Sequence, residues 1–270
     1  MPNPLLLWLP AFGVFGLLFG VWQVLLADLS EGLSLSPGPL GAALTAGFVA
    51  SFPAMIAGGR AADRWGRRSI VVGGGGLMAV AWVGFALIPS FPWLVGLLAV
   101  FYSASGVYDV GINAAAIAAE QRTGRRLLPL FHGAFSGGGA IGALAAGGLV
   151  AAGVPFRWLY VAVALLVAAV VAHLWRGDRG WAVDRADHAA AAGGDRWGLF
   201  RRRALLLVAA VTALGFLFEG AMETWSVVYL RRSLELPPLL GASGAAVFHV
   251  AMLVGRLAST ATVARFGRRA

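Results

Sequence analysis

The sequence of 270 residues contains no cysteine, and only 12% of its residues are charged. Without cysteine there is no disulfide framework, no thiolate metal site and no cysteine nucleophile. A soluble globular domain carries about 25% charged residues, so this chain has about half the usual charge. Its composition is instead 59% hydrophobic, and its mean hydropathy is +0.80.

Sequence patterns typical of enzymes are also missing. The chain has no glycine-rich nucleotide loop, no HExxH motif and no serine–histidine arrangement, so we predict no catalytic residue, no metal site and no cofactor. All 21 basic residues are arginine, and the net charge is +9. In a soluble protein this charge would suggest nucleic acid, but arginines between apolar segments are typical of membrane topology signals. We therefore expect contact with a lipid bilayer and no nucleic-acid partner.

Eight apolar segments are long enough to cross a membrane, because about 20 helical residues span the hydrocarbon. The N-terminus lacks the positive region of a cleaved signal peptide, so the first segment is expected to be retained. The predicted fold class is an all-α polytopic membrane protein with eight transmembrane helices. The segments cover approximately residues 5–29, 40–58, 70–89, 93–119, 128–154, 158–175, 204–230 and 239–263.

The arginines are distributed unevenly among the connections between these segments. Eighteen follow segments two, four, six and eight, whereas Arg157, Arg231 and Arg232 lie on the other side. The positive-inside rule places the richer side in the cytoplasm, and the N-terminus with it. We expect a multi-pass protein of the inner (cytoplasmic) membrane, present as a monomer.

The chain is expected to divide at its one long loop, which mixes charge with the small-residue tract HAAAAGGD. Residues 1–175 would form a six-helix bundle, 176–203 a cytoplasmic linker, and 204–270 the first two helices of a second bundle. An internal repeat supports this division, because a shift of 200 residues places LGA at 40–42 on LGA at 240–242. The chain is thus expected to be a twelve-span protein without its last four helices.

A charged motif, GGRAADRWGRR, follows the second segment, and a weaker copy follows the eighth. In the second copy Ala264 replaces the aspartate of the first. We expect Arg67 or Arg68 to pair with Glu120, Asp63 to meet a helix N-terminus or a basic group, and Gly59 to allow close helix packing. The motif residues are Gly59, Asp63, Arg64, Gly66, Arg67 and Arg68 in the first copy, and Gly255, Arg256, Arg265, Gly267, Arg268 and Arg269 in the second.

The motif, its position and its repetition resemble the loop signature of the major facilitator superfamily. This resemblance implies two six-helix bundles that rock about a central solute site, with the motif acting as a latch between the halves. Segments four and five lack the membrane arginine and the Gly-Pro core of drug:proton antiporters. A closer similarity is to the fucose-permease-like branch of sugar:proton symporters. The residues that carry it are Asp109 and Asn113 in the fourth segment, and Gly220, Ala221, Trp225, Ser226 and Arg231 in the seventh.

Three carboxylates, Asp109, Glu219 and Glu223, lie within apolar segments. A charge at the centre of a membrane helix costs roughly 2.5–3.5 kcal/mol, so these groups should face protein or a water-filled cavity. No basic residue is expected at a similar depth, which favours a functional role. The alternative for Asp109 is a structural polar contact between helices.

Helical spacing groups these acids with other polar residues. The resemblance implies that the first, fourth and seventh helices line the central cavity, so the polar faces would converge there. Small residues on the first helix would leave room beside Gln23. The shared faces are Gly16, Gly20 and Gln23 on the first helix, Asp109, Asn113 and Glu120 on the fourth, and Glu219, Glu223 and Ser226 on the seventh.

These features predict a secondary active transporter that couples protons to the movement of a small polar, sugar-like solute. Asp109 is the expected proton-coupling group, with Glu219 and Glu223 as further candidates. His249 is expected to make a helix–helix hydrogen bond. Export of another metabolite or drug is one alternative, and a non-transporting membrane scaffold or gene fragment is another. The expected solute contacts are Gln23, Asn113, Glu223, Trp225 and Ser226.

Overall fold

The computed structural model describes residues 3–177 and 203–266, of which the last eight are described by their backbone alone. All regular structure in these ranges is helical, and eight helices are long and apolar enough to cross a membrane. The predicted fold class is therefore confirmed. The helices are α1 (Pro4–Gly32), α2 (Pro37–Trp65), α3 (Arg67–Ala86), α4 (Phe91–Thr123), α5 (Leu128–Ala151), α6 (Phe156–Gly177), α7 (Arg203–Arg232) and α8 (Pro238–Phe266).

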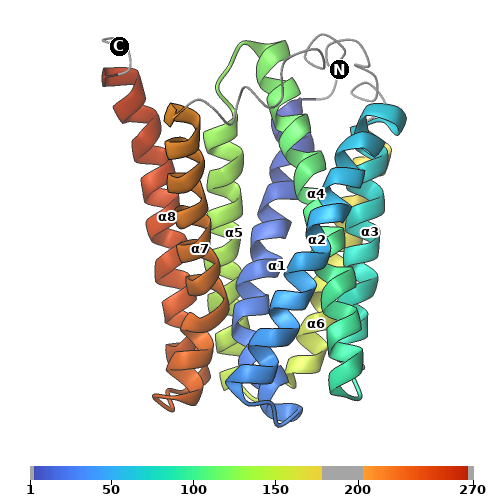
Figure 1. The fold of residues 1–270 in the computed structure, drawn as a ribbon, viewed down its shortest axis with the longest axis vertical. Helices are drawn as coiled ribbons and strands as arrows, with labels where there is room; N and C mark the ends of the chain where they lie inside the picture. The colour runs from blue at the N-terminus through green and yellow to red at the C-terminus, as the bar shows by residue number, and fades with distance from the viewer. Residues whose placement is uncertain (1–2, 178–202, 267–270) are drawn as a thin grey trace.

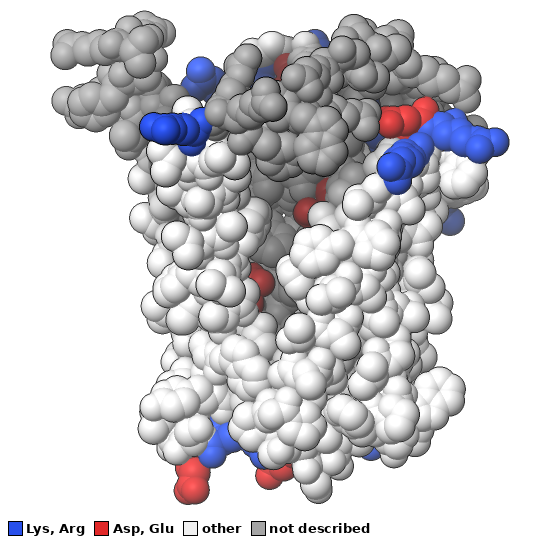
Figure 2. All heavy atoms as spheres, in the orientation of Figure 1, with Lys and Arg blue, Asp and Glu red and all other residues white. Residues whose placement is uncertain are grey.

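The helices stand side by side, with α7 and α8 at one side of the molecule and α2 and α3 at the other (Figure 1). We call the end that carries the α2–α3 and α4–α5 connections the arginine-rich end. The end that carries the α1–α2 and α7–α8 connections is the distal end. Charged atoms gather near these two ends, and the sides of the molecule are apolar (Figure 2).

The apolar sides expose large side chains, including Phe48, Phe52 and Ile56 on α2 and Leu165 on α6. Their exposed fractions lie between 53% and 66%. A continuous apolar surface of this kind is unfavourable in water, whereas in a bilayer it is covered by lipid. The backbone polar groups are satisfied within each helix, as the hydrocarbon region requires.

The charged motif at residues 58–68 is mostly helical, although the sequence suggested a loop. Helix α2 continues to Trp65, and α3 begins at Arg67. The turn is confined to Gly66, which has a φ of 85° and a ψ of 152°. Residues with a side chain are strained in this conformation, so the turn requires glycine.

Helix α5 is glycine-rich because it packs closely against α1 on one face and α8 on another. A side chain at Gly138 or Gly142 would overlap the backbone of α1, so these two glycines allow the close packing. On the other face, Gly133, Gly139 and Gly147 lie against Leu253, His249 and Ala242 of α8. The contact between α5 and α8 therefore runs along most of both helices.

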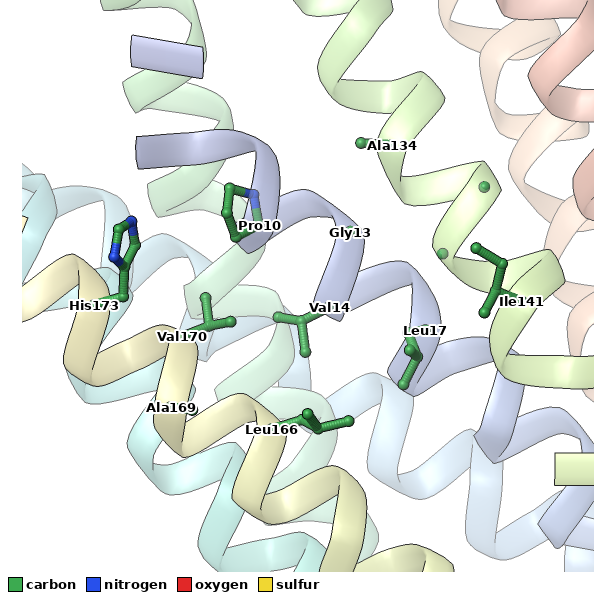
Figure 3. Close-up of a pocket in the computed structure, with 12 residues that line it drawn as sticks. Pro10, Gly13, Val14, Leu17, Ala134, Ile141, Leu166, Ala169, Val170 and His173 are labelled. Atoms are coloured by element: carbon green, nitrogen blue, oxygen red, sulfur yellow. The ribbon is translucent and has the colours of Figure 1, made fainter. Parts of the chain in front are cut away.

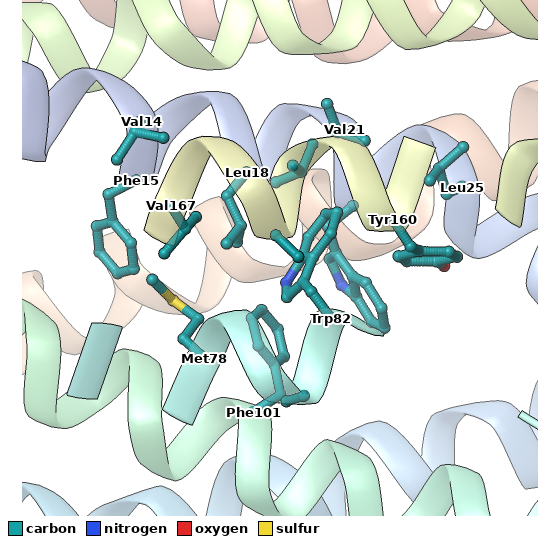
Figure 4. Close-up of a cluster of buried hydrophobic side chains, with 14 of the residues drawn as sticks. Val14, Phe15, Leu18, Val21, Leu25, Met78, Trp82, Phe101, Tyr160 and Val167 are labelled. Carbon is teal, nitrogen blue, oxygen red and sulfur yellow. The ribbon is translucent and has the colours of Figure 1, made fainter. Parts of the chain in front are cut away.

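An aromatic cluster lies on the other side of α1 (Figure 4). The ring of Trp22 lies 5.0 Å from that of Phe85 and 5.3 Å from that of Phe101, and Trp82 lies 5.2 Å from Tyr160. These residues come from α1, α3, α4 and α6. Aromatic rings bury large areas and favour such tilted and edge-on arrangements, so the cluster joins these four helices firmly.

Candidate functional site

A hollow separates the α7 side of the molecule from the α2 side, and acidic atoms are visible inside it (Figure 2). The acidic residues well inside the described helices are Asp109 on α4 and Glu219 and Glu223 on α7. All three are partly buried. They are the same three carboxylates that the sequence marks as out of place in lipid.

Two of these carboxylates, Asp109 on α4 and Glu219 on α7, come from helices on the two sides of the hollow (Figure 1). Asp109 and Glu219 lie close enough for their charges to interact. The Nδ2 atom of Asn113 donates to Asp109 Oδ1 at 2.9 Å and to the Asp109 carbonyl oxygen at 3.0 Å. Asn113 therefore holds the Asp109 side chain in place from one helical turn away. The polar faces of α4 and α7 therefore lie on the two sides of one hollow, without extensive contact between the described residues of the two helices.

Arg256 contradicts the expectation that no basic residue lies near these acids. Its Nη2 atom is 3.6 Å from Glu219 Oε1. Its Nη1 atom donates to Ser136 Oγ at 2.5 Å and to the His132 carbonyl oxygen at 3.1 Å. We assigned Arg256 to the charged motif at the end of the eighth segment, but α8 continues for ten residues beyond it. The long side chain therefore reaches back among α5 and α7.

A second polar cluster lies nearer the distal end. Gln23 on α1 and His249 on α8 are 1% and 0% exposed, and their Nε2 atoms are 2.9 Å apart. The helix–helix hydrogen bond expected for His249 is therefore confirmed. Glu223 Oε1 and Ser226 Oγ on α7 are buried and have no hydrogen-bond partner among the described residues.

Two aromatic residues complete the surroundings of this second cluster. The Tyr102 side chain on α4 lies against Trp22 on α1, and Glu223 is near enough to act on it electrostatically. The ring of Trp225 lies beside Gly41 on α2, so it fills space between α7 and α2. Sequence reasoning did not identify Tyr102, because a tyrosine in an apolar segment is more often part of the core.

The sequence suggested that the glycines of α1 leave room beside Gln23, but the structure shows that they do not. A side chain at Gly16 or Gly20 would overlap the backbone of α5 at Phe135 or Gly139. The two glycines therefore allow α1 and α5 to approach closely, and the space is filled by protein. Helical spacing alone could not show which neighbouring helix would occupy that face.

The first charged motif makes local contacts at the arginine-rich end rather than the expected pair with Glu120. Arg68 donates to the Trp175 carbonyl oxygen, and its guanidinium lies 4.3 Å from the Trp175 ring centroid. Glu120 Oε1 instead accepts from the backbone amides of Leu127 and Leu128 at 2.6 and 2.9 Å. Glu120 thus caps α5, where the helix dipole favours a negative charge.

The glycine that allows close packing in this motif is Gly58, not Gly59. A Cβ atom at Gly58 would lie 3.1 Å from Val107 on α4, whereas one at Gly59 would meet nothing within 4 Å. Asp63 and Arg64 are exposed at the end of α2, and Arg67 is partly buried at the start of α3.

The second copy of the motif is described only in part. Gly255 is exposed in α8, and a Cβ atom there would meet nothing within 4 Å. Gly267, Arg268 and Arg269 lie outside the described residues, as does the side chain of Arg265. The same holds for most of the linker expected at 176–203.

The distal end is closed by contacts that the sequence analysis missed. Arg231 Nη1 of α7 is 2.5 Å from Asp28 Oδ2 of α1, and both side chains are 13% exposed. Arg232 Nη1 donates to Ser30 Oγ at 3.1 Å and to the Leu35 carbonyl oxygen at 2.8 Å. Opposite charges at the ends of two predicted spans were a usable signal, since parallel helices place their last turns side by side.

A separate cavity of about 650 Å³ lies between α1, α5 and α6 on the outside of the bundle (Figure 3). Its walls are apolar, with Val14, Leu17, Ile141 and Leu166 among them. Its polar side chain, His173, is 3.2 Å from the Leu6 carbonyl oxygen. The cavity contains none of the candidate residues and has the chemistry of a lipid-facing groove.

A family model described as Major Facilitator Superfamily matches residues 7–270. An uncharacterized MFS-type transporter of Yersinia pestis is 28% identical over 265 residues, which cover 96% of this chain and 65% of that protein. An uncharacterized transporter of Sinorhizobium fredii is 27% identical, covering 93% of this chain and 66% of its own length. Membrane protein MosC of Rhizobium meliloti is 25% identical, with 96% and 62% covered. The chain therefore spans less than two thirds of the length of these relatives.

Proposed function

The chain belongs to the Major Facilitator Superfamily, and from this premise we propose that it carries a small polar, sugar-like solute across the inner membrane and couples this transport to proton movement. Residues 1–175 would act as one rigid bundle, and 204–270 would belong to the second, joined by the linker at 176–203. The similarity of Asp109, Asn113 and the α7 pattern to the fucose-permease-like branch supports a solute of this class.

The observation that carries this proposal is that Asp109 and Glu219 lie near enough for their charges to interact, with Arg256 beside Glu219. Two carboxylates in a poorly hydrated space repel each other strongly. A proton bound by Asp109 removes that repulsion, and its release restores it. Proton occupancy would therefore change how closely α7 approaches α4, which is what coupling to a rocking movement requires.

The contacts at the two ends support an assignment of which side of the membrane the hollow faces in this structure. Asp28 and Arg231 close the hollow at the distal end. The positive-inside rule supports a cytoplasmic arginine-rich end, and with it a cytoplasmic N-terminus. The structure would then represent the state that exchanges solute with the cytoplasm. Glu219 and Glu223 would share the coupling role, and Gln23, Asn113, Trp225 and Ser226 would contact the solute.

Proteoliposomes containing a pH-sensitive dye test the coupling. A panel of monosaccharides is applied with and without a pH gradient, and proton movement is recorded. We expect Asp109→Asn to lose accumulation driven by the gradient but to keep exchange of solute at equal concentrations. Glu31→Gln, at an exposed position near the distal end of α1 and outside the charged motifs, is the matched control. If Asp109→Asn still accumulates solute against its gradient, the assignment of Asp109 is wrong.

A further inference from the structure

We propose that Gln23 and His249 form a subsite that binds a hydroxyl group of the solute. The proposal rests on the proposed function, because it names the chemical class of solute that the hollow would accept. Neither α8 nor His249 was among the expected solute contacts. The subsite would join a helix of the first bundle to a helix of the second.

The hydrogen bond between the two side chains leaves a defined pair of unused atoms. The Gln23 amide nitrogen can only donate, so His249 Nε2 accepts, and the neutral ring carries its hydrogen on Nδ1. Gln23 Oε1 and His249 Nδ1 have no partner among the described residues. The pair therefore presents one free acceptor and one free donor.

This result does not depend on how the amide is oriented. If the Gln23 amide is turned over, its oxygen accepts from His249 Nε2, and the ring then has a bare Nδ1. The amide nitrogen becomes the free donor, and Nδ1 becomes the free acceptor. One donor and one acceptor remain in either case.

A hydroxyl group complements such a pair, because it donates one hydrogen bond and accepts others. An ammonium group only donates, and a carboxylate only accepts, so each would leave one buried atom of the pair without a partner. The subsite therefore favours a neutral solute with several hydroxyl groups over amines and organic acids. Trp8, Trp82 and Tyr160 also have an unpaired buried atom each. Among the described residues, however, only the Gln23–His249 pair offers a donor and an acceptor side by side, which is why it points to a ligand.

The position of the pair fits a central solute site. Gln23 and Glu223 each lie nine residues before the distal ends of α1 and α7, which places them about 14 Å from that end. His249 and Tyr102 each lie eleven residues after the starts of α8 and α4, about 16 Å from the same end. The four helices have 29 to 33 residues and extend beyond a hydrocarbon core of about 30 Å, so both depths fall inside the core, where transporter sites occur.

Helix α7 carries two further polar atoms, unpaired among the described residues, that would bind other hydroxyl groups of the same solute. Glu223 Oε1 and Ser226 Oγ are buried without partners, on the helix that faces α1. Meanwhile His249 is held in place by α5, since its ring lies over Gly139 and edge-on to Phe135 at 6.2 Å between centroids. The donor and the acceptor are therefore positioned before the solute arrives.

The test measures binding with the purified chain in lipid nanodiscs. The probes are monosaccharides, each paired with its monodeoxy analogues, and matched amines and carboxylates. Affinity is followed by tryptophan fluorescence and by calorimetry. We expect one sugar to bind on the order of tenfold more tightly than one of its deoxy analogues, as for a neutral hydrogen bond at a site built to receive it.

Three variants separate the roles of the pair. His249→Phe keeps a planar ring without polar atoms, and Gln23→Leu removes the other half of the pair. Both should weaken sugar binding on the order of tenfold and abolish the preference over the deoxy analogue. His249→Asn, which keeps a donor and an acceptor, should retain part of that preference. If His249→Phe does not fold, Gln23→Leu decides the same question.

The outcomes distinguish the subsite from the proposed function. The hydroxyl subsite is overturned if the protein binds the amines or carboxylates more tightly than the sugars. It is also overturned if Gln23→Leu keeps the full preference for the sugar over its deoxy analogue. Neither result contradicts the proposed transport. Sugar binding with the expected preference, but without proton movement in proteoliposomes, overturns the proposed coupling and supports the subsite. A folded protein that binds none of the three classes overturns both.

Discussion

The two ends of the helix bundle are built differently. At the distal end, charged contacts cross from α7 to α1, through Arg231 with Asp28 and Arg232 with Ser30. At the arginine-rich end, Arg68 contacts Trp175 within the first six helices, and Arg256 of α8 reaches the His132 carbonyl oxygen about one turn inside α5. The first half of α7, residues 203–218, is exposed throughout.

This difference shows where the two groups of helices are held together. The Asp28–Arg231 pair is short and mostly buried, whereas the Arg256–Glu219 pair is 3.6 Å long and more than a quarter exposed. A buried pair with good geometry is strongly destabilised when one partner is lost, while an exposed pair contributes little. The distal pair thus acts as a clamp, and the inner pair can change partners at small cost.

The largest expected effect comes from breaking the clamp. Asp28→Asn leaves Arg231 with an uncompensated buried charge, which should reduce the free energy of unfolding by roughly 3 kcal/mol. Because the chain has no cysteine, Ala27→Cys provides a unique label at a buried position beside the pair. We expect maleimide labelling of this cysteine to be slow in the native background and fast with Asp28→Asn. The double variant Asp28→Ala with Arg231→Met should recover most of the stability, and equal labelling in all backgrounds contradicts the clamp.

The next effect concerns the turn at the arginine-rich end. Gly66→Ala places a side chain at a φ of 85°, and we expect a loss of about 2 kcal/mol in thermal unfolding. Gly59→Ala is the matched control in the same motif, since its Cβ atom meets nothing within 4 Å. That change lies in a helix and should be neutral or stabilising by up to about 1 kcal/mol. Equal losses in the two variants would show that the turn geometry is not what requires glycine.

A smaller effect is expected at the start of α5. Glu120→Ala removes the acceptor of two backbone amides and should cost about 1 kcal/mol of unfolding free energy. Glu120→Gln keeps an acceptor and loses only the charge at the helix N-terminus, so about half of that loss should remain. Urea unfolding in detergent measures both. A larger loss with Gln than with Ala contradicts the capping role.

The smallest effect on stability is expected for the inner pair. Glu219→Gln breaks a long, partly exposed contact and leaves the Arg256 hydrogen bonds to Ser136 and His132 in place, so it should lower the free energy of unfolding by about 0.5–1 kcal/mol. Transport should suffer more than stability, because Asp109 then no longer faces a second carboxylate. A stability loss as large as that of Asp28→Asn would make the inner pair a second clamp and remove the contrast between the ends.

Much of the fold was predictable, because the lengths of the eight apolar segments and the uneven distribution of arginines between their connections depend on local composition. Within the site, Asp109 and Asn113 were predictable as a pair one helical turn apart. Arg256 was misplaced, because its partners Glu219 and Ser136 are 37 and 120 residues away in the chain. No local pattern reports contacts over such separations.

The sequence by itself determined that eight segments are long and apolar enough to cross a membrane and that three carboxylates must avoid lipid, because hydrophobic transfer depends on composition and helix length alone. Only the tertiary structure decided which groups those helices bring together. Gly16 and Gly20 pack against α5 rather than beside a solute, and Gln23 meets His249. Each outcome depends on which helix packs against which face, and helical periodicity specifies the face but not the neighbour.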